Sequence, residues 1–273
     1  MINVRRITSQ YNFKTAKALG QNFLTDEFIM DAIVGGLQAT KEDTVIEIGP
    51  GVGVLTGLAA DQCGKLVAIE LDDRLIPILH ENLAGYFNVE IVHGDVLKTD
   101  LKQFAEKPVI LGNLPYYITT PILMKFIEDK VPMKAAVFMV QKEVADKLTA
   151  APGSSNYGVL AVIMQQFFNI TYIVEAPPEA FMPAPKVTSQ VVRLVPDEVR
   201  AASLKSGEDF IALVKKAFSQ RRKTLANSMA GWKGMDKAAA AAWLSENGID
   251  PQRRPESLSS EEFAKLSNSM FLI

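Results

Sequence analysis

The sequence predicts an α/β protein in which a mostly parallel β-sheet with covering helices is followed by a small α-helical domain. Short, nearly continuous apolar runs alternate with helical patterns in the first half of the chain, which is typical of a parallel sheet covered on both faces. After Pro196 only helical patterns follow. The 273 residues, 48% of them hydrophobic, suffice for one large and one small domain. We place these domains at residues 1–198 and 199–273.

Seven apolar runs are the candidate strands of the sheet. Helical patterns lie between the first five, so we expect these to run parallel through βαβ units. No helical pattern separates the last two, and we expect an antiparallel strand where they close the sheet. The candidates are Val45–Ile48, Leu66–Ile69, Val89–Val92, Val109–Leu111, Ala135–Val140, Ile170–Val174 and Val187–Val195.

Capping residues mark where helices of the first domain begin. Thr25 is a hydroxyl cap that precedes two acids and then apolar residues at helical spacing. Thr120 is the expected cap of a second helix, with Pro121 at its first helical position.

The C-terminal domain is expected to consist of three main helices. Ser206 fits a capping box, and the helix after it carries one apolar face from Phe210 to Leu225. An alanine-rich helix follows at residues 236–247, and Ser259 opens the last helix.

Composition argues against several classes of protein. Cys63 is the one cysteine, and the two histidines, His80 and His93, lack metal-ligand spacing, so we expect neither disulfides nor a metal. No run approaches the roughly 18 apolar residues of a membrane span, and we expect a cytoplasmic protein. The net charge of −2 demands no anionic partner, but basic residues without acids gather in 1–25 and 210–235.

A glycine-rich loop follows the first candidate strand. In VIEIGPGVGVLT, residues 45–56, glycines at 49, 51 and 53 precede a helical pattern. Glycines allow a tight turn and a close approach of backbone to a ligand. The spacing is G-x-G-x-G, not the dinucleotide fingerprint, because Val54 stands where no glycine completes it. No Lys-Ser/Thr pair follows, which excludes a Walker-type phosphate site.

Two acids stand at the ends of the next two strands. Glu70 follows LVAI, at a spacing where its carboxylate can hold both hydroxyls of a ribose. Asp95 follows the third strand and can accept a hydrogen bond from an adenine amine. The alternative is a glycine turn with solvated carboxylates. Three ligand groups at successive strand ends favour an adenosine ligand without pyrophosphate, such as S-adenosyl-L-methionine.

The tetrad Asn113-Leu114-Pro115-Tyr116 ends the fourth strand beside the same edge. The exocyclic amine of adenine is a weak nucleophile, because its lone pair is delocalised into the ring. An amide oxygen and a backbone carbonyl held by proline can accept its two N–H groups, while Tyr116 stacks on the base. The alternative is a proline turn with Tyr116 in the core.

The sequence resembles one known family over nearly its whole length and in that family's order. The family is the S-adenosylmethionine-dependent small-subunit ribosomal RNA adenine N6-dimethyltransferases, of the bacterial KsgA type. The matching stretches are KALGQNFL (17–24), VIEIGPGVGVLT (45–56), IELDDRL (69–75), HGDVLKTDL (93–101), GNLPYYITTPIL (112–123), FMPAPKVTSQVVRL (181–194), AFSQRRKTLANSM (217–229) and RPESLSSEEF (254–263).

The resemblance implies a Rossmann-like class I methyltransferase sheet and a helical RNA-binding domain. It also implies dimethylation of two adjacent adenines near the 3′ end of small-subunit rRNA, a part in small-subunit assembly, and a monomer. Its implied cofactor residues are Asn22 and Leu24 in a lid, Gly49 and Gly51 in the glycine loop, Glu70 at the ribose, Asp95 at the adenine, and Asn113 beside both the methyl donor and the target amine.

The resemblance also implies that Phe181 sandwiches the target base against Tyr116. The alternative for Phe181 is a core aromatic beside a proline corner. Leu114 replaces a Pro or Ile of related tetrads, and we expect the altered pocket to help readmit a monomethylated base. Tyr117, where the family often has Asn, is assigned no role.

The basic segment of the C-terminal domain fits RNA contact. Arg221, Arg222 and Lys223 lie among stripes of basic and polar residues on the predicted helix, opposite its apolar face. Such stripes suit a phosphate backbone, although a solvated helix face is the common alternative.

Three competing functions are weighed against this one. A macrolide-resistance enzyme would methylate large-subunit rRNA, but Pro121 and the FMPAPKV and RPESLS stretches favour the small-subunit enzyme. A non-enzymatic nucleic-acid-binding relative is disfavoured by the intact set of site residues. An NAD-dependent dehydrogenase is the weakest option, because the glycine spacing is wrong and no proton donor stands near the site.

Overall fold

The computed structural model describes residues 21–220 and 222–270, which fall into two compact units. Of the described residues, the first unit contains 21–145 and Ile170–Val195, and the second contains Asp146–Asn169, 196–220 and 222–270. This division differs from the expected one at residues 198 and 199, because the segment 146–169 packs with the C-terminal helices. We describe each unit by itself.

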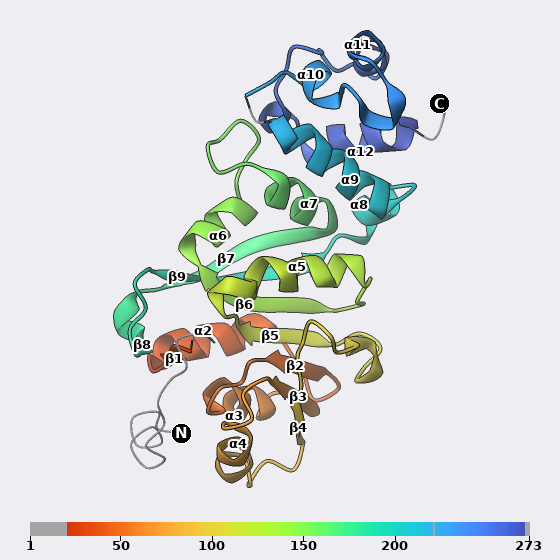
Figure 1. The fold of residues 1–273 in the computed structure, drawn as a ribbon. Coiled ribbons are helices and arrows are strands. Elements are labelled where there is room, and N and C mark those ends of the chain that lie inside the picture. The colour runs from red at the N-terminus through yellow and green to blue at the C-terminus, as the bar shows by residue number, and fades with distance from the viewer. Residues whose placement is uncertain (1–20, 221, 271–273) are drawn as a thin grey trace. The chain divides into compact units, whose positions relative to one another are not determined.

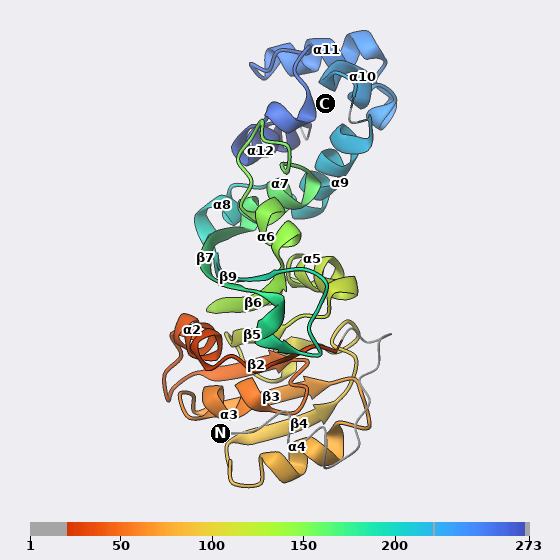
Figure 2. The ribbon, with the colours of Figure 1, turned by 90° about the vertical axis from the view of Figure 1, so that its left-hand side faces the viewer.

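A seven-stranded sheet forms the first unit, and it confirms the predicted α/β fold class. Figures 1 and 2 both show β4, β3, β2, β5 and β6 side by side in this order. These five pair parallel, whereas β9 pairs antiparallel with β6 and has β7 as its other neighbour. The strands are β2 (Thr44–Ile48), β3 (Lys65–Glu70), β4 (Val89–His93), β5 (Val109–Asn113), β6 (Ala135–Gln141), β7 (Phe168–Ala176) and β9 (Ser189–Pro196).

The register of the sheet brings four strand ends to one edge. Ile48 pairs with Ile69 of β3 and with Gly112 of β5, so the loops that follow these strands leave together. Glu70 likewise pairs with His93 of β4. Because β2 lies between β3 and β5, the order of connections reverses at β2, and ligands of open α/β sheets bind outside such a point.

Four helices accompany these strands. Helix α2 packs against β5 and β6, α3 against β2 and β3, and α4 against β4. In α2 the cap is Asp26, which accepts a hydrogen bond from the Ile29 amide, and not Thr25 as expected; the Thr25 hydroxyl instead donates to the Ala180 carbonyl. The helices are α2 (Glu27–Leu37), α3 (Val54–Ala60), α4 (Ile76–Asn82) and α5 (Thr119–Glu128).

The cap expected for α5 is wrong as well, because the N-cap residue is Ile118 and not Thr120. Helix α5 begins at Thr119, whose hydroxyl donates to the Pro115 carbonyl, so Thr120 and Pro121 lie inside its first turn. A small second sheet was missed by the sequence: β1 (Phe23–Leu24) pairs antiparallel with β8 (Phe181–Met182). This pair ties the segment before α2 to a segment more than 150 residues later.

The second unit is helical. Its caps follow the prediction at Ser206, which accepts from the Asp209 amide, and at Ser259, which forms a full capping box with Glu262. Its helices are α7 (Val159–Phe167), α8 (Glu198–Ala202), α9 (Gly207–Ala217), α10 (Leu225–Met229), α11 (Lys237–Glu246) and α12 (Ser260–Ser269), and α6 (Lys142–Leu148) precedes them. Short 3₁₀ turns lie at Leu101–Gln103, Tyr116–Ile118, Pro178–Ala180, Phe218–Gln220, Trp232–Gly234 and Pro255–Ser257.

The long helix expected from Phe210 to Leu225 is broken. Helix α9 ends at Ala217, and α10 begins at Leu225. The amides of Leu225 and Ala226 donate to the carbonyls of Arg253 and Pro251, so they are not used to continue the helix. The basic and polar stripes predicted on one helix are therefore divided. Lys215 and Lys216 lie in the last turn of α9, whereas Arg222 and Lys223 lie on the turn before α10.

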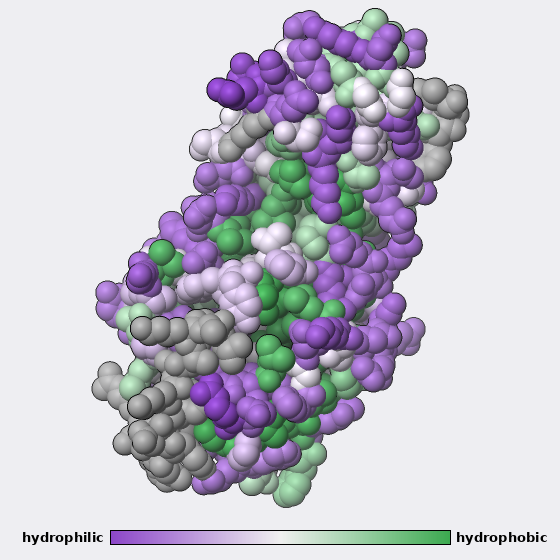
Figure 3. Space-filling model, viewed as in Figure 1, coloured by the Kyte–Doolittle hydropathy of each residue, from purple (hydrophilic) through white to green (hydrophobic). Residues whose placement is uncertain are grey.

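The surface is mostly hydrophilic on the face that Figure 3 shows, with apolar residues in separate patches between polar ones. In the described ranges 21–220 and 222–270, no helix is long and apolar enough to cross a membrane.

Candidate functional site

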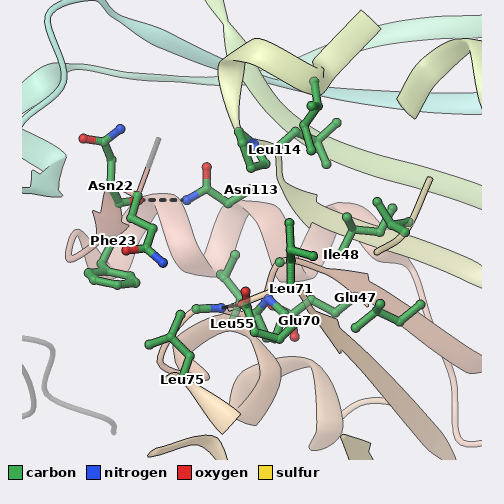
Figure 4. Close-up of a pocket in the computed structure, with 18 of the residues that line it drawn as sticks. Asn22, Phe23, Glu47, Ile48, Leu55, Glu70, Leu71, Leu75, Asn113 and Leu114 are labelled. Carbon is green, nitrogen blue, oxygen red and sulfur yellow. Dashed lines mark hydrogen bonds between the residues drawn. The ribbon is translucent and has the colours of Figure 1, made fainter. Parts of the chain in front are cut away.

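A pocket opens at the edge of the sheet where β2, β3, β4 and β5 end. Its walls come from the glycine loop, the segments after β3 and β4, the Asn113–Ile118 segment, and residues 21–24 (Figure 4). It encloses about 1040 Å³ of empty space, part of it open to solvent. The sequence placed Asn22, Leu24, Gly49, Gly51, Glu70, Asp95, Asn113, Leu114, Pro115 and Tyr116 at one site, and all ten line this pocket.

The glycine loop turns sharply at the base of the pocket. Gly49 and Gly51 have φ of 68° and 63°, in the left-handed region that side chains rarely adopt. A Cβ on Gly51 would also lie 3.0 Å from the ring of Phe23. The loop therefore needs glycine for its backbone conformation and for the close approach of β1.

Glu70 is held by the backbone of two loops. Its Oε2 accepts from the Gly51 amide at 3.1 Å, and its Oε1 accepts from the Asp72 amide at 2.8 Å. The side chain is 6% exposed, and burial raises its pKa, while these backbone hydrogen bonds oppose the shift. Because each oxygen keeps lone pairs, the carboxylate can also accept bonds from two vicinal hydroxyls.

Asp95 is fixed by its own turn. Its Oδ1 accepts from the Leu97 amide at 2.9 Å, and its Oδ2 lies 3.8 Å from the Nζ of Lys98. The preceding residue, Gly94, donates its amide to the Glu70 carbonyl. The two acids of the site are thus joined through adjacent backbone.

Asn113 connects the end of β5 with the segment before β1. Its Nδ2 donates to the Asn22 carbonyl at 3.1 Å, the bond drawn in Figure 4. Within the described residues, its Oδ1 accepts no hydrogen bond. The amide group therefore has its nitrogen engaged and its oxygen ready to accept a hydrogen bond from a ligand.

The carbonyl groups of the next two residues differ. The Pro115 carbonyl already accepts from the Ile118 amide and from the Thr119 hydroxyl, both at 3.1 Å. The Leu114 carbonyl accepts from no residue that the structure describes, and its peptide is fixed by the proline that follows. Leu114 thus offers the second acceptor of the site.

Tyr116 is held by a strand far away in the chain. Its hydroxyl lies 2.7 Å from the Oγ of Ser189, a fully buried residue at the start of β9. Burial raises the pKa of Tyr116, and the bond to Ser189 opposes the shift in part. The phenol is therefore neutral at physiological pH, and its ring is anchored at one end.

Phe181 is not brought to this pocket. It is 5% exposed, pairs with Leu24 through β8 and β1, and belongs to the core cluster of the unit. Its burial favours the alternative of a core aromatic over the expected sandwich with Tyr116. Phe181 shares this cluster with Phe23 and Leu24 of β1.

Two features of the site were missed by the sequence. Asp72 accepts from the Nε2 of Gln21 at 2.7 Å and forms an ion pair with Arg74 at 2.6 Å, so it holds the segment that enters β1. Arg74 also keeps the pKa of Asp72 below its usual range. An acid two residues after Glu70 was visible in the sequence, but its partner 51 residues earlier was not.

The second missed feature is Glu47, an acid inside the apolar strand β2. It lines the pocket, is 1% exposed, and its Oε2 has no hydrogen-bond partner in the part of the chain that is described. Burial raises its pKa to about 8; the Thr56 hydroxyl opposes this, and the charge of Glu70 adds to it. Glu47 is therefore mostly protonated at neutral pH. The sequence signal for Glu47 was a single acid within an otherwise apolar predicted strand.

The predicted RNA-binding residues lie in the second unit. Arg222 and Lys223 are exposed on the turn between α9 and α10, and Arg221 lies outside the described residues. The basic N-terminal segment, residues 1–20, also lies outside them. In the described ranges, no group of three or more His, Cys, Asp or Glu could hold a metal ion.

This arrangement suits an adenosine ligand at the acids and a second, planar group beside Asn113. The pocket offers hydroxyl acceptors on one side and amine acceptors with an anchored aromatic ring on the other. No histidine is among the described residues that line the pocket.

Comparisons with known proteins agree on one family. The model of the family described as ribosomal RNA adenine dimethylase matches residues 12–271. A protein of Alkaliphilus oremlandii named ribosomal RNA small subunit methyltransferase A is 43% identical over 273 residues, which cover 97% of this chain and 95% of that one.

Two solved structures share the fold. A dimethyladenosine transferase from Plasmodium falciparum has a TM-score of 0.79 and 29% identity, covering 89% of this chain and 95% of that one. The 23S rRNA methyltransferase ErmE has a TM-score of 0.71 and 25% identity, covering 90% and 98%.

Proposed function

The chain belongs to the ribosomal RNA adenine dimethylase family, and from this premise we propose that it transfers methyl groups from S-adenosyl-L-methionine to the N6 amine of adenines in small-subunit rRNA. As in the resemblance, the product is N6,N6-dimethyladenosine at two adjacent positions near the 3′ end. One observation carries the proposal: Asn113-Leu114-Pro115-Tyr116 shares a pocket with the glycine loop and Glu70.

The cofactor's place is the side of the pocket formed after β2, β3 and β4. Glu70 accepts hydrogen bonds from the ribose hydroxyls, and Asp95 accepts one from the adenine amine. Gly49 and Gly51 leave room for the ligand against the backbone. Asn22 and Leu24 cover it from the β1 side, where Asn113 and Asp72 hold their segment.

The target amine is received at the end of β5. The Oδ1 of Asn113 and the Leu114 carbonyl each accept one N–H, which favours a more tetrahedral and more nucleophilic nitrogen. Tyr116 stacks on the base, with its ring fixed through Ser189. Since Phe181 is buried, we assign the stacking to Tyr116 alone.

Positioning and polarisation supply the rate in this reaction. The cofactor brings a methyl group that its sulfonium already activates, so a strong base is not required. While Asn113 and the Leu114 carbonyl accept its N–H groups, the amine nitrogen would bond to the methyl carbon as the bond from that carbon to the sulfonium breaks. S-adenosylhomocysteine would leave as a neutral thioether, and the extra proton on nitrogen would pass to water. A pocket without histidine is compatible with this order.

The second methylation requires a pocket that accepts a monomethylated base. Leu114 is 1% exposed, and its Cδ2 would lie 2.7 Å from a Cβ on Gly112, so its side chain packs against the strand and away from bulk solvent. Its amide donates to the Met139 carbonyl, a bond that Pro could not make. Leu114→Ile therefore tests the role of this side chain better than Leu114→Pro, because it keeps the hydrogen bond to Met139. An unchanged ratio of mono- to dimethyl product would mean that Leu114 does not help to admit the monomethylated base.

The second unit is proposed to bind the RNA backbone. Arg222 and Lys223 are exposed, and charge reversal of both should weaken RNA binding. The slope of log K for RNA binding against log salt concentration should become less steep by about 0.7 for each phosphate contact that is lost. Cofactor affinity should not change. An RNA affinity equal to that of the native protein would reject this surface.

We also propose that the protein acts as a monomer in the cytoplasm, without a metal, and takes part in small-subunit assembly. The resemblance supports the monomer and the part in assembly, the composition supports the cytoplasmic location, and the chemistry above supports the absence of a metal.

The decisive experiment is methyl transfer from labelled S-adenosylmethionine onto unmethylated small subunits, with large-subunit rRNA alongside. Label recovered as N6,N6-dimethyladenosine from small subunits alone is the expected result. Label on large-subunit rRNA would favour the activity named for ErmE, and cofactor binding without transfer would favour a non-enzymatic factor.

A further inference from the structure

Tyr117 is a large aromatic residue that the fold leaves at the pocket. Its side chain is 54% exposed, whereas its neighbour Leu114 is 1% exposed. It lines the same pocket as Asn113 and Tyr116. Within the described residues its hydroxyl forms no hydrogen bond. Neither core packing nor a polar contact thus explains a tyrosine at this position.

The backbone presents Tyr117 on a rigid turn. Residues 116–118 form a 3₁₀ turn between Pro115 and α5, closed by the bonds of the Ile118 amide and Thr119 hydroxyl to the Pro115 carbonyl. Successive side chains of a 3₁₀ turn diverge by about 120°. Since the Tyr116 ring is tied to Ser189, Tyr117 is directed elsewhere while it stays on the pocket wall.

The proposed reaction creates a need for such a ring. A target adenine that enters the pocket must leave its stack, and its neighbouring base then exposes one face. An aromatic side chain replaces the lost contact, and it does so for any base because every base has a π-face. We propose that Tyr117 stacks on the nucleotide next to the target adenine, an inference that rests on the proposed function.

This assignment separates the two tyrosines of the turn. Tyr116 holds the base that reacts, and Tyr117 holds its neighbour, so Tyr117 contributes to RNA binding and not to the chemical step. Exposure alone does not make a stacking residue: Phe87, fully exposed in the loop before β4, does not line the pocket. Phe87 therefore serves as the matched control.

The test measures kcat and KM for unmethylated small subunits with Tyr117→Ala, Tyr117→Phe and Phe87→Ala. We expect Tyr117→Ala to raise KM by about 5- to 150-fold, the range found when one stacked base loses its aromatic partner. Its kcat and its cofactor Kd should match the native protein. Tyr117→Phe keeps the ring and should stay within about twofold in KM, as should Phe87→Ala.

Either of two results would overturn the inference. One is an unchanged KM in Tyr117→Ala. The other is an equal loss in Tyr117→Phe, which would assign the effect to the hydroxyl. Cofactor Kd and thermal midpoint, measured on every variant, show whether a KM change comes from misfolding. A native protein that methylates no small-subunit adenine would instead reject the proposed function, before Tyr117 is tested.

Discussion

The cofactor side and the target side of the pocket are built in different ways. On the cofactor side, Glu70 is held by amides 19 and two residues away, and Asp95 by an amide two residues away. On the target side, Asn113 is bonded to Asn22, 91 residues away, and Tyr116 to Ser189, 73 residues away. The first side follows from strand ends and their loops, while the second requires the whole unit to assemble.

The largest effect is expected at Glu70, the carboxylate that we assign to the ribose hydroxyls of the cofactor. Glu70→Ala removes the acceptor of two ribose hydroxyls and of the Gly51 amide, and hydrogen bonds to a charged group contribute about 1.5–3 kcal/mol each. Cofactor Kd, measured by calorimetry, should rise by about 10²- to 10⁴-fold.

Glu90 supplies the control for this change. It lies on the neighbouring strand β4, about half exposed, in an ion pair with Lys65. Glu90→Ala should leave cofactor Kd nearly unchanged, because an exposed ion pair contributes little. Equal losses in both variants would mean that damage to the sheet, and not a lost ligand contact, weakens binding.

Asn113 tests the target side. Asn113→Ala removes one of the two acceptors for the amine, and we expect kcat to fall by about 10²-fold, comparable to the loss of one polarising hydrogen bond in other active sites. KM for the RNA should change far less. A drop in RNA affinity with kcat unchanged would mean that Asn113 binds the RNA and does not polarise the amine. The role that we assign to it on the target side would then be rejected.

This contrast also explains what the sequence could and could not predict. Gly49, Glu70 and Asp95 stand at the ends of apolar strands, so alternation of strands and helices was enough to bring them to one edge. Ser189 looked like an ordinary strand residue, because its partner is defined only after β9 inserts beside β6.

The same limit applies to helices and to core residues. The end of α9 depends on carbonyls near residues 251–253 that accept the amides of α10, and local helical spacing contains no such information. The resemblance placed Phe181 at the target base, yet its side chain is buried in the core cluster that also contains Leu24. Helices and strands could be predicted from local sequence patterns, whereas contacts between distant segments could not.

Glu47, on the cofactor side of the pocket, should make the free energy of unfolding depend on pH. Its pKa is 4.5 when unfolded and about 8 when folded, so between these values the native state holds one more proton and stability falls as pH rises. From pH 6 to 8 the free energy of unfolding should fall by up to about 2.7 kcal/mol relative to Glu47→Gln, at about 1.36 kcal/mol per unit.

Urea unfolding at pH 6, 7 and 8 measures this difference. Far-UV circular dichroism is the suitable probe, because Trp232 and Trp243 both lie in the second unit and their fluorescence would not report on β2. Parallel curves for Glu47→Gln and the native protein would mean that Glu47 is ionised in the folded state.

The smallest effect is expected for the anchor of Tyr116 on the target side. In a double-mutant cycle, Ser189→Ala and Tyr116→Phe each remove one partner of the 2.7 Å hydrogen bond. If the bond orients the ring, the two changes should lower kcat/KM for the RNA by similar amounts, and the double variant should lose little more. The coupling should be about 0.5–1.5 kcal/mol, the usual contribution of a neutral hydrogen bond.

Cofactor Kd separates this orienting role from a general structural one. Ser189 is fully buried, so its loss could loosen β9 and with it the sheet. A loosened sheet would weaken binding on both sides of the pocket, whereas a misdirected ring affects the RNA side alone. Additive losses in kcat/KM, or a cofactor Kd that rises with each variant, would therefore place Ser189 in the packing of β9. Coupled losses at constant cofactor Kd would show that a contact across 73 residues orients the ring that receives the target base.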